Sequence, residues 1–191
     1  ALIPRQLQNA GLTQSGAAQA FGQVTGMVAP LLYLPMLLVG PIIQVVTPAV
    51  AERMGAGRKD RVLELLRKAL YMAGAAGMVF AGILALAPSH IGRILYGAPH
   101  IAALIRPLSV AAPFVYLGMV ASGVLYGLGH VAAVTVSVFA GNLIRCILIY
   151  AMVPARGILG AVWALVADHV VTAVLNIACL GWFMSRRQRN R

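Results

Sequence analysis

The sequence predicts an all-α integral membrane protein of about five transmembrane helices, because of its composition, the length of its apolar stretches and the placement of its charges. Hydrophobic residues make up 61% of the 191 residues and charged residues only 10%, with a mean hydropathy of +0.88. A soluble domain carries about 25% charged residues, because its surface faces water. A chain this apolar has too few polar residues for such a surface, so its outer solvent must be lipid.

Five apolar stretches are long enough to cross the hydrocarbon core of a bilayer, which takes about 20 helical residues. They define a transmembrane bundle over 17–184, with expected spans at about 17–50, 65–88, 104–127, 131–153 and 158–184. Residues 1–16 then form an extracytoplasmic N-terminal segment and residues 185–191 a basic cytoplasmic tail. Because the chain starts at Ala1 without an initiator methionine, we expect it to be the C-terminal part of a longer protein.

The first stretch predicts a bent or broken helix that continues into the following loop. It contains Pro30, Pro35, Pro41 and Pro48, and each proline removes a backbone donor and favours a kink. Gln23 lies on a polar face of this helix. That face either packs against a neighbouring helix or lines a cavity, and both interpretations stay open.

The distribution of Lys and Arg predicts the orientation of the chain. Six of them lie over 53–68 and four over 186–191, two segments that five spans place on the same side. The opposite side carries Arg5, Arg93, Arg106 and Arg156. The positive-inside rule therefore puts the N-terminus outside and the C-terminus in the cytoplasm. Because the basic residues cluster at the ends of apolar stretches, without interleaved aromatic residues, juxtamembrane anchoring explains the charge of +11 better than nucleic-acid binding.

Small residues four positions apart predict close helix packing within the bundle. The pairs are Gly22 with Gly26, Gly118 with Ser122, Gly123 with Gly127, and Gly157 with Ala161. In lipid such pairs let two helix backbones approach each other, so they argue for a compact bundle and for no particular function.

Two charges lie inside the expected spans. Arg145 is in the fourth span and Asp168 in the fifth, at depths that differ by about 3 Å, and the short connection makes these helices antiparallel neighbours. Exposing either charge to lipid would cost at least about 2.5–3.5 kcal/mol. Each should therefore face protein or water.

Two interpretations of these charges stay open. In one, Arg145 and Asp168 form a structural ion pair. In the other, Arg145 binds an anionic group in a polar cavity and Asp168 tunes or neutralises it. The residues expected to line such a cavity are Gln23, Asn142, Arg145, Asp168, Thr172 and Asn176. No nucleophile–base set, metal-ligand cluster or cofactor loop is visible in the sequence, so we expect no enzyme, no metal and no cofactor.

Short motifs follow one another in a characteristic order along the chain. They are Ile3-Pro4-Arg5-Gln6-Leu7, Phe21-Gly22-Gln23-Val24-Thr25-Gly26-Met27, Leu31-Leu32-Tyr33-Leu34-Pro35, Val46-Thr47-Pro48-Ala49-Val50-Ala51-Glu52, Ile94-Leu95-Tyr96-Gly97, Val124-Leu125-Tyr126-Gly127-Leu128-Gly129-His130 and Gly157-Ile158-Leu159-Gly160-Ala161. Their order and spacing resemble the C-terminal half of the stage V sporulation protein B family and related polysaccharide-biosynthesis flippases. These belong to the multidrug/oligosaccharidyl-lipid/polysaccharide exporter superfamily.

The resemblance implies a full protein with two similar helical lobes around a central cavity. This chain would form most of the second lobe, and the N-terminal lobe of the same protein would be its partner. The other implied partners are membrane lipids and an undecaprenyl-pyrophosphate-linked glycan, such as a peptidoglycan precursor. That glycan would cross the bacterial cytoplasmic membrane by alternating access. Arg145 occupies a place in the penultimate helix where the family carries a basic residue, more commonly lysine.

Three functions follow as hypotheses. The leading one is a flippase for lipid-linked oligosaccharide, with Arg145 attracting the pyrophosphate. The second is a cation-coupled exporter of drugs or metabolites from the same superfamily, with Asp168 as the site of the coupling ion. The third is a non-transporting membrane scaffold that helps to assemble an envelope or spore complex.

Overall fold

The computed structural model describes residues 2–34 and 36–189, and the ordered elements of these residues are all helices. The expected last four spans are present as long helices, namely α5 (Lys59–Leu86), α8 (Leu108–Gly127), α9 (Val131–Arg156) and α10 (Ile158–Arg189). Each is long and apolar enough to cross a membrane. The predicted all-α membrane fold is confirmed. Of the expected tail at 185–191, residues 190 and 191 lie outside the described residues.

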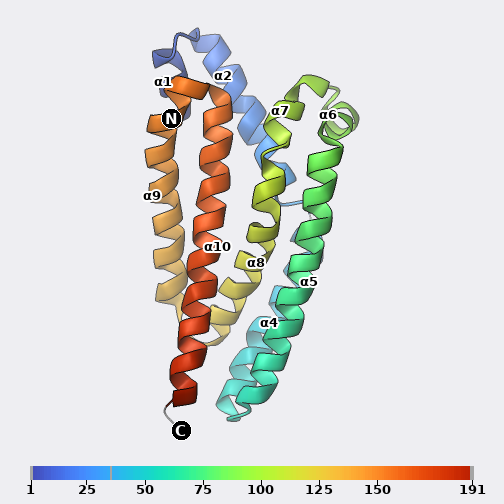
Figure 1. The fold of residues 1–191 in the computed structure, drawn as a ribbon, viewed down its shortest axis with the longest axis vertical. Helices are drawn as coiled ribbons and strands as arrows, with labels where there is room; N and C mark the ends of the chain where they lie inside the picture. The colour runs from blue at the N-terminus through green and yellow to red at the C-terminus, as the bar shows by residue number, and fades with distance from the viewer. Residues whose placement is uncertain (1, 35, 190–191) are drawn as a thin grey trace.

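The expected first span is broken, so the predicted count of five is wrong: within the described ranges, four helices meet the length and hydropathy needed for a span. The stretch divides into α2 (Gln14–Gln23), the π-helix η1 (Val24–Val28), α3 (Ala29–Leu31) and α4 (Met36–Gly55). Figure 1 shows the first three in the upper half of the molecule and α4 in the lower half.

Proline explains part of this break. Pro30 lies in the first turn of α3 and has no N–H to donate, and the π-helical turn directly precedes it. After it, the chain makes only short turns, with the N–H of Leu32 bonded to the carbonyl oxygen of Ala29 at 3.2 Å. Pro41 and Pro48 lie within α4 without ending it, and Pro35 lies outside the described residues. The predicted broken helix is confirmed.

Helix α8 is the centre of the bundle, packed against α4, α5 and α10, while α9 packs on α10 (Figure 1). Small residues allow these close contacts. A Cβ added at Gly77 of α5 would lie 2.7 Å from the Cα of Pro113 in α8. Gly118 of α8 lies against Ala173 of α10, where an added Cβ would come within 3.0 Å of the Ala173 Cβ. Close packing through small residues is therefore confirmed for the centre of the bundle.

The other predicted small-residue pairs differ among themselves. Gly123 and Gly127 lie against α4, where a Cβ on Gly127 would be 2.5 Å from the carbonyl oxygen of Thr47. Gly22 and Gly26 have no neighbouring atom within 4 Å of an added Cβ, so that pair does not mark a close helix contact. Gly157 has a φ of +59°, a conformation that favours glycine, and ends α9 before the turn to α10.

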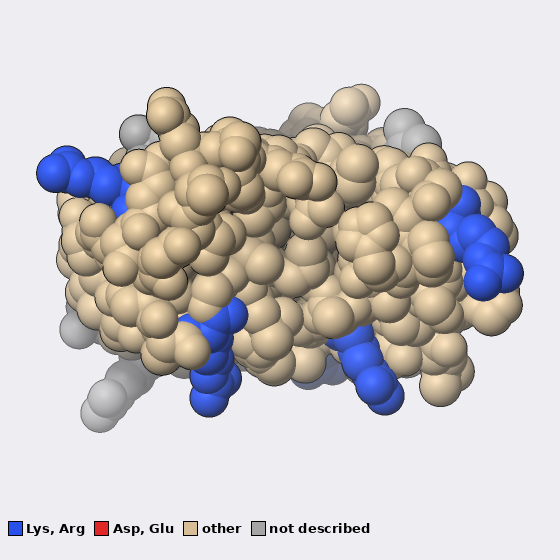
Figure 2. Space-filling model, turned by 90° about the horizontal axis from the view of Figure 1, so that it is seen from above, with Lys and Arg blue, Asp and Glu red and all other residues tan. Residues whose placement is uncertain are grey.

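The two ends of the bundle differ in whether acidic side chains accompany the basic ones. The upper end holds α1 (Leu2–Asn9), α6 (Pro88–Tyr96), η2 (Pro99–Ile101) and α7 (Ala102–Ile105) (Figure 1). Figure 2 shows this end from above, with blue basic side chains around its rim and no acidic side chain on the visible face. The lower end contains the α4–α5 turn, where exposed Glu52 and Asp60 accompany the basic residues.

Candidate functional site

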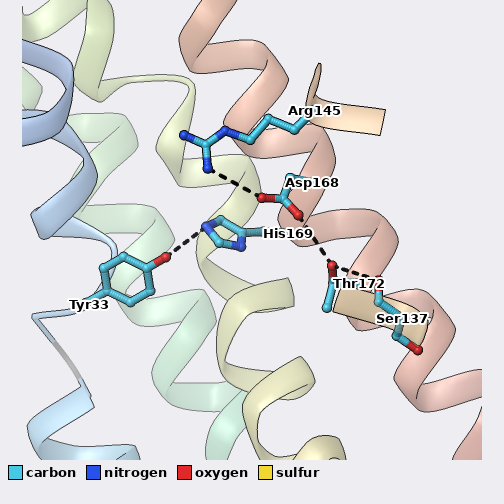
Figure 3. Close-up of polar contacts among 6 residues, drawn as sticks. All are labelled: Tyr33, Ser137, Arg145, Asp168, His169 and Thr172. Atoms are coloured by element: carbon cyan, nitrogen blue, oxygen red, sulfur yellow. Dashed lines mark hydrogen bonds and ion pairs between the residues drawn. The ribbon is translucent and has the colours of Figure 1, made fainter. Parts of the chain in front are cut away.

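Two antiparallel helices bring Arg145 and Asp168 together. Arg145 projects from α9 and Asp168 from α10, with 3.8 Å between Nη1 and Oδ2 (Figure 3). This separation is too long for a direct hydrogen bond, which needs about 2.7–3.2 Å. The Asp168 side chain is only 10% exposed, whereas that of Arg145 is 32% exposed. The expected proximity of the two charges is confirmed, and Arg145 is the member of the pair that faces outward.

Gly141 of α9 makes room for the carboxylate. A Cβ at this position would overlap Thr172 Oγ1 and Asp168 Oδ1, and would lie 3.0 Å from the carbonyl oxygen of Asp168. The absence of a side chain on Gly141 therefore lets one face of α10 lie directly on the backbone of α9. Gly141 could not be identified from the sequence, because an isolated glycine in a helix carries no local signal of what lies opposite.

Thr172 holds the carboxylate only loosely. Its hydroxyl oxygen is 3.4 Å from Asp168 Oδ1 and 3.5 Å from the carbonyl oxygen of Ser137 (Figure 3). A hydroxyl has only one proton to donate, so it cannot donate to both oxygens at once. A strong O–H···O bond is about 2.5–3.0 Å long, and both of these distances are longer. Asp168 is thus buried without a short hydrogen bond from any described residue.

His169, the residue after Asp168, has its hydrogen-bonding contact with Tyr33. Helix geometry turns successive residues by about 100°, and the structure places His169 Nε2 3.2 Å from the hydroxyl oxygen of Tyr33, with the two rings edge to face (Figure 3). The contact joins α10 to the segment where the first expected span is broken. Neither residue is among the six that the sequence predicted to line the cavity, although Tyr33 follows Pro30 by one turn.

Asn176 is fully buried on a different side of α10 from Asp168. Its Nδ2 donates to Ser122 Oγ of α8 at 2.8 Å, and its Oδ1 has no partner among the described residues. Residues four apart on a helix differ in direction by about 40°. Asn176 lies eight residues after Asp168, so it faces α8 whereas Asp168 faces α9. The structure does not bring it together with Arg145.

Gln23 lies at another place again. Its Nε2 is 3.3 Å from His100 Nε2 in η2. Close by along the chain, the hydroxyl of Tyr96 donates to the carbonyl oxygen of Met27 at 2.9 Å. These two contacts tie α2 and the π-helix η1 to the short helices of the upper end.

Of the six residues expected to form one polar cavity, four line two separate cavities, and Gln23 and Asp168 line neither of these. Arg145 and Asn142 line a cavity of about 230 Å³ between α1, α2 and α9. Thr172 and Asn176 line a smaller one of about 150 Å³ between α8, α10 and the Tyr33 segment. Within the described residues, no three His, Cys, Asp or Glu side chains gather where they could hold a metal ion. The first cavity offers a guanidinium and an amide to an anionic group.

Comparison with known proteins identifies the family. The MatE family model matches residues 13–151, well over half of the chain. The chain belongs to the MatE family. Stage V sporulation protein B of Bacillus subtilis (strain 168) is 27% identical over 182 residues, covering 93% of this chain and 35% of that protein. The resemblance inferred from the ordered motifs is thereby confirmed.

This MatE chain spans about a third of the length of the curated relative that it matches. No solved structure matches it. The four apolar helices and the family together identify a multi-pass membrane protein.

Proposed function

We propose that the protein containing this chain is a flippase, which moves lipid-linked oligosaccharide or peptidoglycan precursor across the bacterial cytoplasmic membrane by alternating access. The proposal assigns Arg145 to the pyrophosphate of an undecaprenyl-pyrophosphate-linked glycan. Family membership and the likeness to Stage V sporulation protein B support the class of protein. The N-terminal lobe of a longer protein would supply the other side of the transport cavity.

The observation that carries this proposal is the incomplete pairing of Arg145. An arginine retained only for structure would be expected to bind its carboxylate through two parallel N–H···O bonds. Here the closest approach to Asp168 is 3.8 Å, and the guanidinium hydrogen-bonds no described residue. Its donors are therefore free for an anionic ligand, and a planar guanidinium fits the oxygens of a phosphate.

Asp168 gives this site a means of release. A phosphate bound to Arg145 would compete with a carboxylate already held 3.8 Å away. Competition of this kind lowers the affinity for the anion, so the substrate is not held too tightly to leave. A site that must both load and unload needs such a balance between the states of the transporter.

We place the upper end of the bundle outside the cell and the lower end in the cytoplasm. Residues 1–16 then belong to the extracytoplasmic side, and the tail at 185–191 is cytoplasmic. The excess of Lys and Arg at the lower end supports this orientation. Fusing a periplasm-active and a cytoplasm-active reporter after residue 191 tests it, and activity of the periplasmic reporter would reverse the assignment.

The experiment for the proposed function uses the full-length protein in reconstituted vesicles. Arg145→Ala should lower translocation of the lipid-linked precursor by about 30-fold, because a hydrogen bond to a charged group is worth about 2 kcal/mol. Arg145→Lys should retain part of the activity. Arg156→Ala, which removes an exposed arginine at the end of the same helix, is the matched control. Unchanged translocation by a normally folded Arg145→Ala protein would exclude the proposed role.

The second candidate is export of drugs or metabolites coupled to a cation, and the loosely held carboxylate of Asp168 favours it. The Asp168→Asn substitution separates the two. Loss of ion-driven export of a cationic dye in this variant would support the exporter. A wild-type protein that translocates the precursor and shows no ion-driven export of the dye would support the flippase. A stable envelope-protein partner without flux in either assay would support the scaffold.

A further inference from the structure

We propose that the cavity between α1, α2 and α9 binds the junction between phosphate and isoprenoid chain of a lipid-linked substrate. The inference rests on the proposed function and specifies how that substrate is held. A phosphate oxygen would contact Arg145 and Asn142, and the first isoprenoid carbons would enter the apolar part of the same cavity.

The lining of the cavity changes in character along α9. Asn142 and Arg145 form its polar part, while Ile149, two turns further on, contributes to its apolar part. The other apolar walls are Leu2 and Ile3 of α1 and Phe21 of α2. From Asn142 to Ile149 the helix rises about 10 Å. The cavity therefore offers a polar and an apolar environment side by side, as an amphiphilic ligand requires.

Charge in the cavity favours an anion. Arg145 is the charged residue in the lining, and no aspartate or glutamate of the described chain lines the cavity. Asp168 contacts Arg145 through Nη1 without itself reaching the lining. A negatively charged group that enters the cavity would thus meet a guanidinium with unused donors.

The size of the cavity favours a part of a lipid over a whole glycan. Its volume is about 230 Å³, below the about 300–1,000 Å³ of sites that enclose a complete small molecule. Asn142 and Cys146 are exposed, whereas Ile3 and Ile149 are 6% and 4% exposed and form the floor. The cavity therefore opens to the outside of the bundle, and the rest of a long ligand can extend from it.

Helix α1 forms one wall of this cavity. It packs on α2 and α9, with Ile3 and Leu7 buried in an apolar cluster shared with Ile149 and Val153 of α9. From the sequence, this region was predicted only to be an N-terminal segment before the first span. The buried face of α1 explains why a cavity exists beside Arg145 rather than an open helix surface.

Cys146 provides a direct test, because it lines the cavity and is exposed. The full-length protein would keep Cys146 as its single cysteine, with Cys179→Ser in this chain. The rate of its alkylation by N-ethylmaleimide would be measured in nanodiscs with added undecaprenyl phosphate, undecaprenol, phosphatidylglycerol or inorganic phosphate. Undecaprenyl phosphate at about ten times its Kd should slow alkylation about tenfold, because the free fraction falls as 1/(1 + [L]/Kd).

A matched control uses the neighbouring position on the same helix. In the Cys146→Ser, Ile147→Cys protein, the thiol replaces a side chain that is 57% exposed and does not line the cavity. Its alkylation should not respond to undecaprenyl phosphate. Equal slowing at both positions would mean a general effect on the membrane and would overturn the proposal.

Two variants test the two parts of the cavity separately. Arg145→Gln should abolish protection of Cys146, judged by the ratio of rates with and without ligand, because a nearby charge also changes thiol reactivity. Phe21→Ala keeps the charge and removes an apolar wall, so it should weaken binding of undecaprenyl phosphate about tenfold. Protection unaffected by both substitutions would overturn the proposal.

The ligand series decides the chemistry. Equal protection by undecaprenol would leave an apolar groove without phosphate recognition, and equal protection by phosphatidylglycerol would leave a site for bulk anionic lipid. Equal protection by inorganic phosphate would exclude a role for the isoprenoid chain of the ligand. Each of these results overturns the inference. Loss of precursor translocation in Arg145→Ala without any protection of Cys146 would refute this cavity while leaving the proposed flippase intact.

Discussion

Helices α8 and α9 have comparable hydropathy, yet they have different roles in the molecule. In the most apolar 18-residue stretch of α8, 61% of the residues are buried within the bundle, whereas 22% are buried in the corresponding stretch of α9. Helix α8 meets three other long helices through small residues, whereas α9 packs mainly on α10. Hydropathy shows that both helices can enter a membrane, and the pattern of close contacts shows which of them forms the core.

The difference extends to the polar residues. In α8, Tyr116 is fully buried and its hydroxyl donates to the carbonyl oxygen of Leu32 at 3.1 Å. In α9, Arg145 is a third exposed and 3.8 Å from the nearest carboxylate oxygen. The Tyr116 hydroxyl thus satisfies a buried backbone oxygen, whereas the Arg145 guanidinium keeps unused donors. A ligand can add hydrogen bonds only where donors or acceptors are still unused, as at Arg145.

The largest effect should come from filling a glycine contact at the α8 core. A Cβ in Gly77→Ala would lie 2.7 Å from the Pro113 backbone, so α5 and α8 must separate. We expect a loss of about 2–3 kcal/mol in the free energy of unfolding, in the upper part of the range for overpacked cores. Denaturation in mixed micelles measures it.

Gly82 is the matched control for this prediction, because it lies on the same helix with no atom within 4 Å of an added Cβ. Gly82→Ala should be neutral or stabilise the helix by up to about 1 kcal/mol. Equal destabilisation by both substitutions would show that the α5–α8 contact is not what limits stability.

Replacing glycine with alanine in α9, at Gly141, should affect function more than stability. In Gly141→Ala the added methyl meets the Asp168 and Thr172 side chains and lies 3.0 Å from the Asp168 carbonyl oxygen, so both side chains must move and the two helices must shift slightly. Translocation by the full-length protein should fall about tenfold, because displacing a binding group by about 1 Å is enough to impair a site. Ser137→Ala is the control, since Thr172 contacts only the Ser137 backbone oxygen. Wild-type transport in Gly141→Ala would contradict the importance of the Arg145–Asp168 geometry.

How far the sequence predicts this comparison depends on the kind of feature. Depth along a helix follows from residue number, so the meeting of Arg145 and Asp168 could be predicted from the rise per residue alone. Proline chemistry likewise predicted the broken first span. The count of five failed because a stretch that is apolar throughout need not be one helix, and Pro30 separates two differently placed segments.

Which neighbour a helix face meets could not be predicted in the same way. Periodicity placed Asp168, Thr172 and Asn176 on one side of a helix, but the rotation of about 40° per four residues divides them between α9 and α8. The position of α1 beside Arg145 depends on contacts between residues more than 100 positions apart. No local pattern encodes such a contact, so the cavity became visible only in the structure.

A moderate effect on stability should follow from Tyr116→Phe. The substitution removes the donor to the Leu32 carbonyl oxygen and leaves that acceptor buried where the helix is already broken. An unsatisfied buried group costs about 1–3 kcal/mol, and we expect about 1 kcal/mol. Tyr126→Phe, on the same helix but 46% exposed, should change the unfolding free energy little. A Tyr116→Phe protein as stable as the wild type would show that the break does not need this bond.

The smallest effect should come from Asn176→Leu, although sequence reasoning placed Asn176 among the cavity residues. Its Oδ1 is already unpartnered, and Ser122 keeps a bond of 2.8 Å to the carbonyl oxygen of Gly118 after the substitution. Replacing a half-satisfied amide with a side chain of similar volume should shift the unfolding free energy by less than about 0.6 kcal/mol, the average for a hydrogen bond between membrane helices. Asn176 does not line the cavity at Arg145, so protection of Cys146 by undecaprenyl phosphate should also persist. Loss of that protection in a stable Asn176→Leu protein would mean that the two cavities act as one site, and that α10 has no separate structural and functional sides.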